Sequence, residues 1–295
     1  HAVADLYLAR HLKPAAPDVE RLRALYSRLE LRSLLKQLPG DEFSPVLAPL
    51  PSPADAGEGR LRPGEGPALE RNYELILTQD AFEPWLRRLE TAELISFDTE
   101  TTSLDYMRAE IVGVSFCVEA GHAAYVPLAH TYAGAPDQLD RTTVLDTLRP
   151  LLEDPARAKL GHHLKYDAHV LRNHGIELRG MKFDSMLESY LLNSTATRHD
   201  LDSVAKLYLG VDTIKYEDVA GKGAKQITFN QVALKEASEY AAEDADVTLQ
   251  LHHVLHGALE REPGLLKVYE EIEQPLIPVL LEMEHRGVLV DRDLL

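Results

Sequence analysis

Apolar and polar positions follow two different spacings along the chain, and each spacing predicts a different kind of element. Short apolar runs bounded by turn residues predict strands at 73–77, 94–100, 110–120, 122–128 and 158–162. Apolar residues three or four positions apart predict helices at 79–92, 140–154, 163–175, 185–194, 200–210, about 230–259 and 265–287. A short turn containing glycine separates the third and fourth strands, which should therefore form a hairpin. Strands that come first and helices that follow predict an α/β fold, a mixed β-sheet flanked by α-helices.

The two ends of the chain differ from this central pattern. Leucines at helical spacing predict a helical tail within residues 1–40. Residues 41–71 are dense in proline, glycine and acidic side chains, so they should form a flexible linker. We expect a compact domain over residues 72–260, and residues 261–295 should begin a further domain.

The composition of the chain restricts the classes of function that it can have. The 295 residues include 31 basic and 48 acidic side chains, a net charge of −17, which argues against a free-standing nucleic-acid-binding protein. An enzyme whose acidic site is neutralised by metal ions stays compatible with that charge. The single cysteine, Cys117, lies in a strand-like run and is expected to be buried in a protein of the reducing cytosol. No run of residues has the length and apolarity of a membrane span or a signal peptide.

Acidic residues gather in three segments that should otherwise be apolar. Asp98 and Glu100 end a strand and, being two residues apart, point to the same face. Asp167 lies near the start of a helix that is apolar on one side. Tyr240 and Asp244 are four residues apart on the long helix and share one of its faces.

Two other acids of the long helix must be weighed beside Asp244. Asp246 is six residues from Tyr240 and should point away from it, whereas spacing alone does not exclude Glu243. For any one of these acids, a helix cap or a surface ion pair is the alternative interpretation.

Four converging carboxylates would require cations, because each buried charge costs several kcal/mol. Two divalent cations would cancel four negative charges, and oxygen ligands favour Mg²⁺ or Mn²⁺. Two such ions about 3.5–4 Å apart form an arrangement that cleaves phosphodiesters.

Five stretches are similar to one known family. The segments "FDTETTSL", "LKYDAHVL", "FDSMLESYLLNS", "RHDLDSVA" and "YAAEDADVTLQLH" resemble, in unbroken order over residues 72–260, the proofreading 3′–5′ exonuclease domain of the bacterial DNA polymerase I family. The resemblance implies a ribonuclease-H-like fold and an Asp-Glu-Asp-Asp site of the Tyr subtype. It also implies that residues 1–40 are the tail of a 5′-nuclease region and that 261–295 are the truncated start of a polymerase domain.

The resemblance assigns roles to the acidic residues and the tyrosine. Asp98, Glu100 and Asp244 resemble the ligands of the metal ion on the side of the attacking nucleophile. Asp98 and Asp167 resemble those of the ion on the side of the leaving group, Asp167 partly through water. Tyr240 resembles the residue that orients the attacking water, with assistance from Glu100.

Further residues resemble parts of a substrate site. Leu104 and Tyr216 resemble the side chains that pack against the terminal bases, a contact that tolerates any sequence. Arg198 and Lys222 could contact phosphates, although a solvated surface is the alternative for both. With His163 and Lys165, the substrate-binding candidates are Leu104, Tyr216, His163, Lys165, Arg198 and Lys222.

Three histidines, His163, His252 and His256, lie where they could affect a charged or metal-binding site. His163 stands where the family usually has asparagine, and carboxylates nearby should keep it protonated to a higher pH than a free imidazole. His252 and His256 are four residues apart on the long helix, which is a spacing found in zinc sites. No cysteine or HExxH motif accompanies them, so we expect exposed helical histidines rather than zinc ligands.

The sequence thus predicts an enzyme that uses two divalent cations, Mg²⁺ or Mn²⁺, to release nucleoside 5′-monophosphates from single-stranded or frayed DNA 3′ ends. Its expected partners are primer-template DNA and the polymerase domain, and it should be a monomer. A catalytically silent module that holds DNA ends is one alternative. An RNA-trimming exonuclease of the same superfamily is the other.

Overall fold

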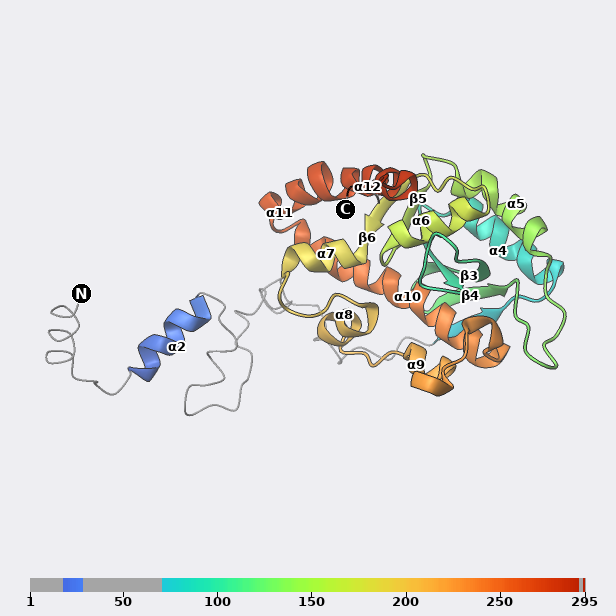
Figure 1. Ribbon diagram of the computed structural model, residues 1–295, viewed down its shortest axis with the longest axis horizontal. Coiled ribbons are helices and arrows are strands. Elements are labelled where there is room, and N and C mark those ends of the chain that lie inside the picture. Colours follow the sequence, from blue (N-terminus) through green and yellow to red (C-terminus); the bar gives the residue numbers. More distant parts are fainter. Residues whose placement is uncertain (1–17, 29–70, 292–293, 295) are drawn as a thin grey trace, which may run out of the picture. The chain divides into compact units, whose positions relative to one another are not determined.

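A computed structural model describes residues 18–28, 71–291 and 294. The chain divides into two compact units, residues 1–60 and 61–295. The described part of the first unit is helix α2 (Val19–Arg28), shown in blue in Figure 1. Residues 29–70, which include nearly all of the predicted linker, lie outside the described residues. The fold and the site described below belong to the second unit.

A six-stranded mixed sheet forms the centre of this unit, with the strand order β1-β4-β3-β2-β5-β6. The antiparallel pairs are β2 with β3 and β3 with β4, and the remaining neighbours are parallel. The hairpin expected between the third and fourth strands is confirmed, and Gly121 supplies the positive φ of 85° in its turn. The strand bounds are β1 Asn72–Leu75, β2 Leu94–Thr101, β3 Ile111–Glu119, β4 His122–Pro127, β5 Ala158–Gly161 and β6 Met181–Asp184.

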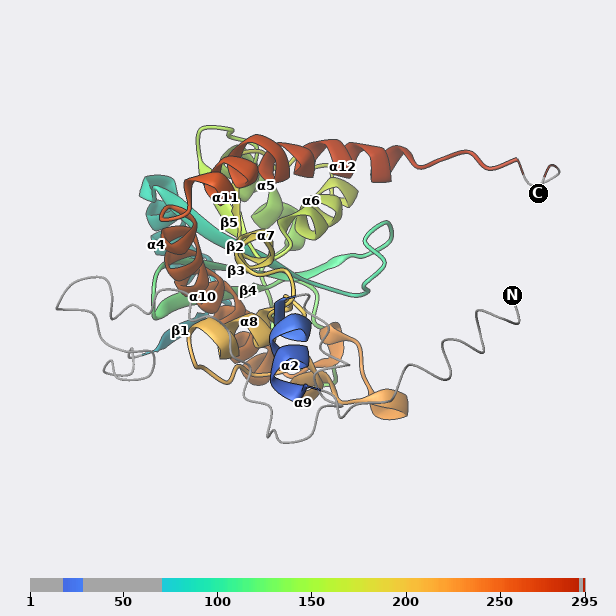
Figure 2. The same cartoon turned by 90° about the vertical axis from the view of Figure 1, so that its left-hand side faces the viewer.

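Helices cover both faces of the sheet (Figures 1 and 2). Helices α4 (Gln79–Thr91), α5 (Arg141–Leu152) and α6 (Leu164–Asn173) share one apolar core with the sheet. Helix α10 (Leu234–Leu259) crosses the opposite face. Beside it lie α7 (Ser185–Leu192), α8 (Leu201–Tyr208) and α9 (Tyr216–Ala220), with 3₁₀ turns at Gly223–Lys225 and Phe229–Gln231.

Strand β2 is buried on both faces, so its alternation decides which side chain meets which layer. Ile95 and Phe97 join the core beneath α4, α5 and α6. Ser96 points the other way, and its hydroxyl donates a 2.8 Å hydrogen bond to the carbonyl of Ala245 in α10. Helix α10 contributes small residues to this contact, Ala242 and Ala245 among them, which lets it lie close to the strand. The same alternation sends Asp98 and Glu100 toward α10.

The C-terminal segment packs on α6. Helices α11 (Pro263–Val268) and α12 (Gln274–Arg286) are separated by a π-helical turn over Tyr269–Glu273, where the sequence predicted one helix. Pro275, which has no N–H to donate to a preceding carbonyl, is the second residue after this turn. Ion pairs from Lys165 and Arg172 of α6 to Glu284 and Glu282 hold α12 in place.

Two short elements were missed by the periodicity. These are strand β6, with the sequence MKFD, and helix α9, with the sequence YEDVA, in both of which charged residues weaken the apolar signal. The burial of Cys117 is confirmed, and that burial raises the pKa of its thiol. Among the described helices, none combines the length and apolarity that a membrane crossing needs.

Candidate active site

Three of the predicted metal ligands meet where β2 passes α10. Asp98 and Glu100 project from the last residues of the strand, and Asp244 projects toward them from the helix. One oxygen from each carboxylate lies within 4.8 Å of the others. Glu100 is buried, and the other two are half-buried. A strand repeat of two residues and one helical side chain therefore produce a compact acidic cluster.

Asp167 reaches the same end of β2 from the other layer. It lies in the first turn of α6 and is buried. The backbone N–H of Thr99 donates to its Oδ1 at 3.0 Å, and the Thr99 hydroxyl donates to the same oxygen at 2.6 Å. Thr99 faces α6 because it alternates with Asp98 and Glu100. Sequence reasoning missed this positioning residue, although its place between two acids was a usable signal.

The four carboxyl groups disfavour one another's charge. Burial raises the pKa of Asp98 to about 6. Burial, followed by the charges of Asp98, Asp244 and Asp167, raises the pKa of Glu100 well above its usual range. Burial and the charge of Asp98 also raise the pKa values of Asp167 and Asp244. Asp167 is thus close enough to share the electrostatics of the cluster.

The cluster fits divalent cations. Glu100 Oε1 is buried and has no hydrogen-bond partner among the residues that the structure describes. A buried carboxylate oxygen without a partner is costly unless a cation binds it. The surrounding donors are carboxylate oxygens, which are the ligands that Mg²⁺ and Mn²⁺ prefer.

Tyr240 lies beside the cluster as its helical spacing predicted. Its side chain lies close enough to Asp244, one turn further along α10, for the charge of that carboxylate to add to burial in raising the pKa of the phenol. Burial, followed by the charges of Asp244 and Glu100, raises the pKa of the phenol, so the hydroxyl keeps its proton at neutral pH.

An aromatic group adjoins this tyrosine. The Tyr216 ring stacks on Phe229 with 6.2 Å between centroids and meets Tyr240 edge-on at the same separation. Tyr216 is 37% exposed and Leu104 is 92% exposed, so both predicted base-packing side chains are accessible. Phe229, which supports Tyr216 from within the core, was missed by sequence reasoning.

A buried tyrosine underlies Glu100. Gly113 pairs with Glu100 across the strands, and a Cβ added at Gly113 would lie 2.2 Å from the Tyr125 hydroxyl. His130 Nδ1 contacts the carbonyl of Val232 at 3.0 Å and must donate to it, which leaves Nε2 to accept from Tyr125 at 2.8 Å. Burial lowers the pKa of His130 to about 4, consistent with a neutral ring.

The two acids of α10 that flank Asp244 in sequence, Glu243 and Asp246, are structural. Glu243 pairs with Arg71 at 2.5 Å and accepts the backbone N–H of Ile214 at 2.6 Å. Asp246 accepts the Gly121 N–H at 2.8 Å and the Tyr73 hydroxyl at 2.7 Å. Both side chains connect α10 to neighbouring segments. Glu243 is therefore not part of the acidic cluster, a question that its spacing in the sequence left open.

His163 differs from its prediction. It caps the start of α6 in the left-handed region, with φ 72°, and its backbone N–H donates to Asp184 at 3.2 Å. Burial lowers its pKa and outweighs the opposing effect of Asp184, so the expected rise in pKa is wrong. The physical reason is that desolvation disfavours the charged imidazole more than the nearby carboxylate favours it.

The basic residues predicted to bind substrate are already paired with acids. Lys165 pairs with Glu284, Arg198 with Asp200 at 3.0 Å and Lys222 with Glu217 at 2.6 Å. Arg198 and Lys222 are exposed, whereas Lys165 is half-buried against α12. Their contact with a substrate stays a prediction.

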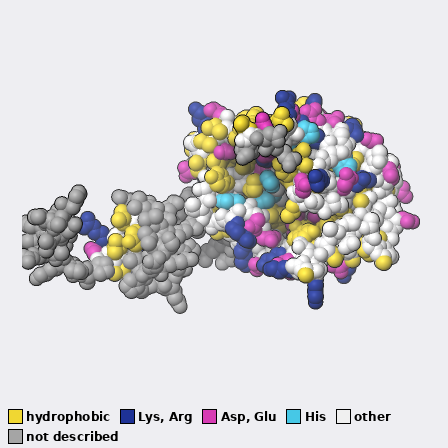
Figure 3. Space-filling view, in the orientation of Figure 1, with side chains coloured by type: hydrophobic (Ala, Val, Ile, Leu, Met, Phe, Trp, Pro, Cys, Tyr) yellow, Lys and Arg dark blue, Asp and Glu magenta, His cyan; other side chains and the backbone are white. Residues whose placement is uncertain are grey.

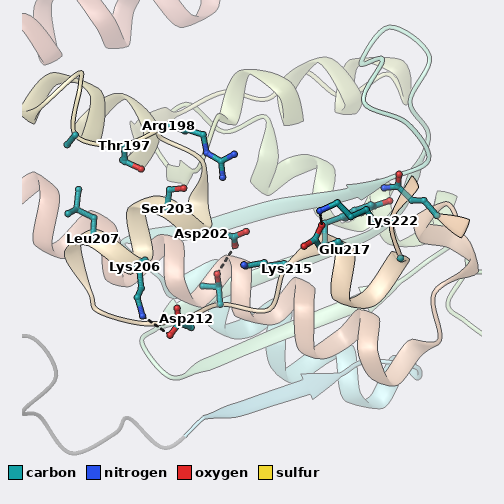
Figure 4. Close-up of a pocket in the computed structure, with 15 residues that line it drawn as sticks. Thr197, Arg198, Asp202, Ser203, Lys206, Leu207, Asp212, Lys215, Glu217 and Lys222 are labelled. Atoms are coloured by element: carbon teal, nitrogen blue, oxygen red, sulfur yellow. Dashed lines mark hydrogen bonds and ion pairs between the residues drawn. The ribbon is translucent and has the colours of Figure 1, made fainter. Parts of the chain in front are cut away.

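A groove of about 920 Å³ runs along α8 and α9 beside Tyr216 (Figure 4). Arg198, Lys206, Lys215 and Lys222 line it, together with acids such as Asp202. The face drawn in Figure 3 likewise mixes basic and acidic side chains. The groove therefore offers cations to an extended anion without being strongly basic.

The histidines of α10 also differ from their prediction. His252 is 6% exposed and lies 2.8 Å from the buried Glu188 of α7, whereas an exposed side chain was expected. The packing of α7 on α10 covers this part of the helix, which a single-helix pattern does not reveal.

A mixed sheet with acids grouped at the end of its central strand, flanked by helices, is the architecture of ribonuclease-H-like nucleases. The chain belongs to one family within that class: the family model described as 3′–5′ exonuclease matches residues 73–260.

Individual relatives agree with this assignment. The chain is 53% identical over 289 residues to DNA polymerase I of Pseudomonas aeruginosa, an alignment that covers 96% of this chain and 30% of that protein. Among solved structures, the POL domain of Pol1 from M. smegmatis has a TM-score of 0.57 at 22% identity, covering 74% of this chain and 33% of that chain. Escherichia coli RNase D, an exoribonuclease, has a TM-score of 0.51 at 22% identity, covering 74% and 52%. The chain spans less than a third of its polymerase relative, and the structural likenesses concern the fold alone.

Proposed function

We propose that this chain hydrolyses the terminal phosphodiester of single-stranded or frayed DNA 3′ ends with two divalent cations, Mg²⁺ or Mn²⁺, and releases nucleoside 5′-monophosphates. The observation that carries the proposal is the cluster of Asp98, Glu100 and Asp244 with the unpartnered Glu100 Oε1. Among the described residues no basic side chain pairs with these buried and half-buried acids, and such acids in a member of an exonuclease family are suited to metal-dependent phosphodiester cleavage.

The protein's own groups would position the reactants. Asp98, Glu100, Asp167 and Asp244 would hold the cations, and Thr99 would fix the direction of the Asp167 carboxylate. Bound cations would activate the attacking water and neutralise charge on the leaving 3′-oxygen. The Tyr240 hydroxyl would orient that water, since it lies against Asp244 and keeps its proton.

Substrate would be held by stacking and charge. Leu104 and Tyr216 would pack on the terminal bases, which are reachable only after they leave a duplex. Arg198 and Lys222, along the groove of Figure 4, would exchange their carboxylate partners for phosphates. In this proposal the chain works as a monomer, as the proofreading part of a longer DNA polymerase.

The test uses end-labelled single strands of DNA and RNA of one sequence, with Mg²⁺, Mn²⁺ or EDTA. We expect stepwise shortening of DNA from the 3′ end, none in EDTA, and loss of nearly all activity in Asp98→Ala. Asp146→Ala is the matched control, because Asp146 is an exposed acid on α5 paired with Arg149.

Each contrary outcome points to a specific alternative. Substantial cleavage by Asp98→Ala would contradict the cation-binding role of the cluster. Faster shortening of RNA than of DNA would favour an RNA-trimming enzyme. Binding of DNA ends without cleavage by the unsubstituted chain would favour an end-holding module.

A further inference from the structure

Three metal-ligating side chains converge between α7 and α10, away from the acidic cluster. Glu188 Oε1 lies 2.8 Å from His252 Nδ1 and 3.3 Å from His256 Nδ1. The three ligand atoms all lie within 4.8 Å of one another. Asp244 and His252 are eight residues apart on α10, which corresponds to about 12 Å along the helix axis.

Some buried polar atoms of this group lack hydrogen-bond partners among the described residues. The side chain of Glu188 is 0% exposed. Within the part of the chain that the structure describes, its Oε2 has no hydrogen-bond partner, and His256 Nδ1 has none either. A buried carboxylate with one unpartnered oxygen costs free energy unless a cation compensates it. The Glu188 carboxylate raises the pKa of His256, so a proton is one cation that the group can take.

Aromatic rings adjoin both histidines, so a bound cation should balance the charge of Glu188 better than surrounding water does. The Phe183 ring lies 4.3 Å from the His252 ring and 4.9 Å from the His256 ring, between centroids. The Tyr269 ring also lies near His256, with 5.9 Å between ring centroids. Aromatic walls lower the local dielectric and strengthen any bond between Glu188 and a cation.

The donor set suits a borderline transition metal. Two imidazole nitrogens and one carboxylate oxygen are the protein ligands of one class of zinc site, with bonds of about 2.0–2.2 Å. Tetrahedral ligands at that bond length stand roughly 3.3 Å apart, close to the 2.8 Å and 3.3 Å separations in this group. His256 and Tyr269 also line a cavity of about 680 Å³, which provides an entry path and room for a water as fourth ligand.

We propose that Glu188, His252 and His256 form a zinc-class divalent cation site that is separate from the catalytic carboxylates. The ion would bridge α7 and α10 by binding one ligand from the first helix and two, one turn apart, from the second. Its role would be structural, because the ligands come from the helix that carries Asp244 and Tyr240 and from the helix packed on it.

The test must exclude the acidic cluster, which could also bind Zn²⁺. We therefore use the 295-residue chain carrying Asp98→Ala and titrate Zn²⁺ by calorimetry, with melting temperature as a second readout. We expect one site and a rise in melting temperature. Adding His256→Gln should weaken Zn²⁺ binding by at least roughly 10- to 100-fold. That is the usual cost of losing a residue that only hydrogen-bonds to a metal ligand, and His256 is proposed to be a ligand itself. His253→Gln is the matched control, because His253 is an exposed neighbour on the same helix and outside the group.

A second measurement does not depend on how the variants fold. In the unsubstituted chain, the ring resonances of His252 and His256 should shift on addition of Zn²⁺ and remain in place on addition of Mg²⁺. Absence of Zn²⁺ binding in the Asp98→Ala chain, or unchanged ring resonances for these two histidines, would overturn the proposal. So would equal Zn²⁺ affinity in folded His256→Gln and His253→Gln chains.

Discussion

Asp98 holds its proton more tightly in the folded chain than in the unfolded one. Its pKa rises from the usual 3.8 to about 6, chiefly through burial. Between these two values the folded state binds more protons, so the free energy of unfolding must fall as pH rises. We expect the metal-free chain to lose thermal stability progressively from about pH 4 to above pH 6, in step with this proton release.

Melting curves in EDTA at several pH values measure this loss. Asp98→Asn cannot ionise, so it should flatten part of the decline, whereas Asp146→Asn, on the exposed face of α5, should leave it as in the unsubstituted chain. Added Mg²⁺ should remove most of the decline, because bound cations favour the ionised carboxylates. An unchanged slope in Asp98→Asn would show that Asp98 does not contribute to it.

The Tyr240 hydroxyl offers a second prediction at the scale of single residues. Tyr240→Phe keeps the ring in contact with Tyr216 and Phe229 but removes the hydroxyl that lies near Asp244. We expect the rate of single-turnover cleavage to fall about a hundredfold, the range typical of losing a positioned proton-transfer or orienting group. The affinity for Mn²⁺ should change little, since no carboxylate is lost.

The control for this substitution is Tyr190→Phe, because Tyr190 is exposed on α7 and lies outside the cluster. Its cleavage rate should equal that of the unsubstituted chain. A Tyr240→Phe chain that cleaves at full rate would remove the hydroxyl from the mechanism.

At the scale of elements, the side chain of Tyr125 in β4 leaves no room for a side chain at Gly113 of β3. A Cβ there would lie 2.2 Å from the hydroxyl and 2.4 Å from the ring of Tyr125, which is fully buried. Gly113→Ala should therefore destabilise the chain by about 1–3 kcal/mol, the usual cost of overpacking a core. Because Gly113 pairs with Glu100, the affinity for Mn²⁺ should fall as well.

Gly257 is the matched control, since it lies within α10 and a Cβ added there meets nothing within 4 Å. Gly257→Ala should stabilise the chain by about 0.5–1 kcal/mol, because alanine favours a helix interior. Denaturant unfolding of both variants measures the difference. Equal stabilities would contradict the close packing of Tyr125 beneath the site.

At the scale of the whole molecule, charge limits the affinity for DNA. The chain carries −17, and Arg198 and Lys222 in the groove are each paired with an acid. We expect weak binding of single-stranded DNA, because few phosphate contacts can form and each must displace an existing carboxylate partner. Binding should weaken further with salt, because each contact that does form releases counterions. Fluorescence anisotropy with the inactive Asp98→Ala chain measures it. Tight binding that does not respond to salt would contradict this view of the groove.

Much of the site could be predicted because its spacings are local. A strand places Asp98 and Glu100 on one face, and a helix places Tyr240 and Asp244 on one face, whatever the rest of the chain does. Apolar periodicity likewise located most helices and strands, including the hairpin of β3 and β4. Strand β6 and helix α9 were missed because their apolar signal is weak: β6 alternates Met181 and Phe183 with charged residues, and α9 carries two acids in five residues.

Contacts between elements were decided by the tertiary structure alone. Spacing left Glu243 open, and only the packing of α10 beside Arg71 turned it away from the cluster. Thr99 acquired its role because α6 brings Asp167 to the opposite face of β2. The sequence by itself thus determined the family, the sheet with its flanking helices and the acids that share a face. Packing determined which acids are buried together, why His163 has a lowered pKa and how Glu188 meets two histidines, because desolvation and distance depend on neighbours remote in sequence.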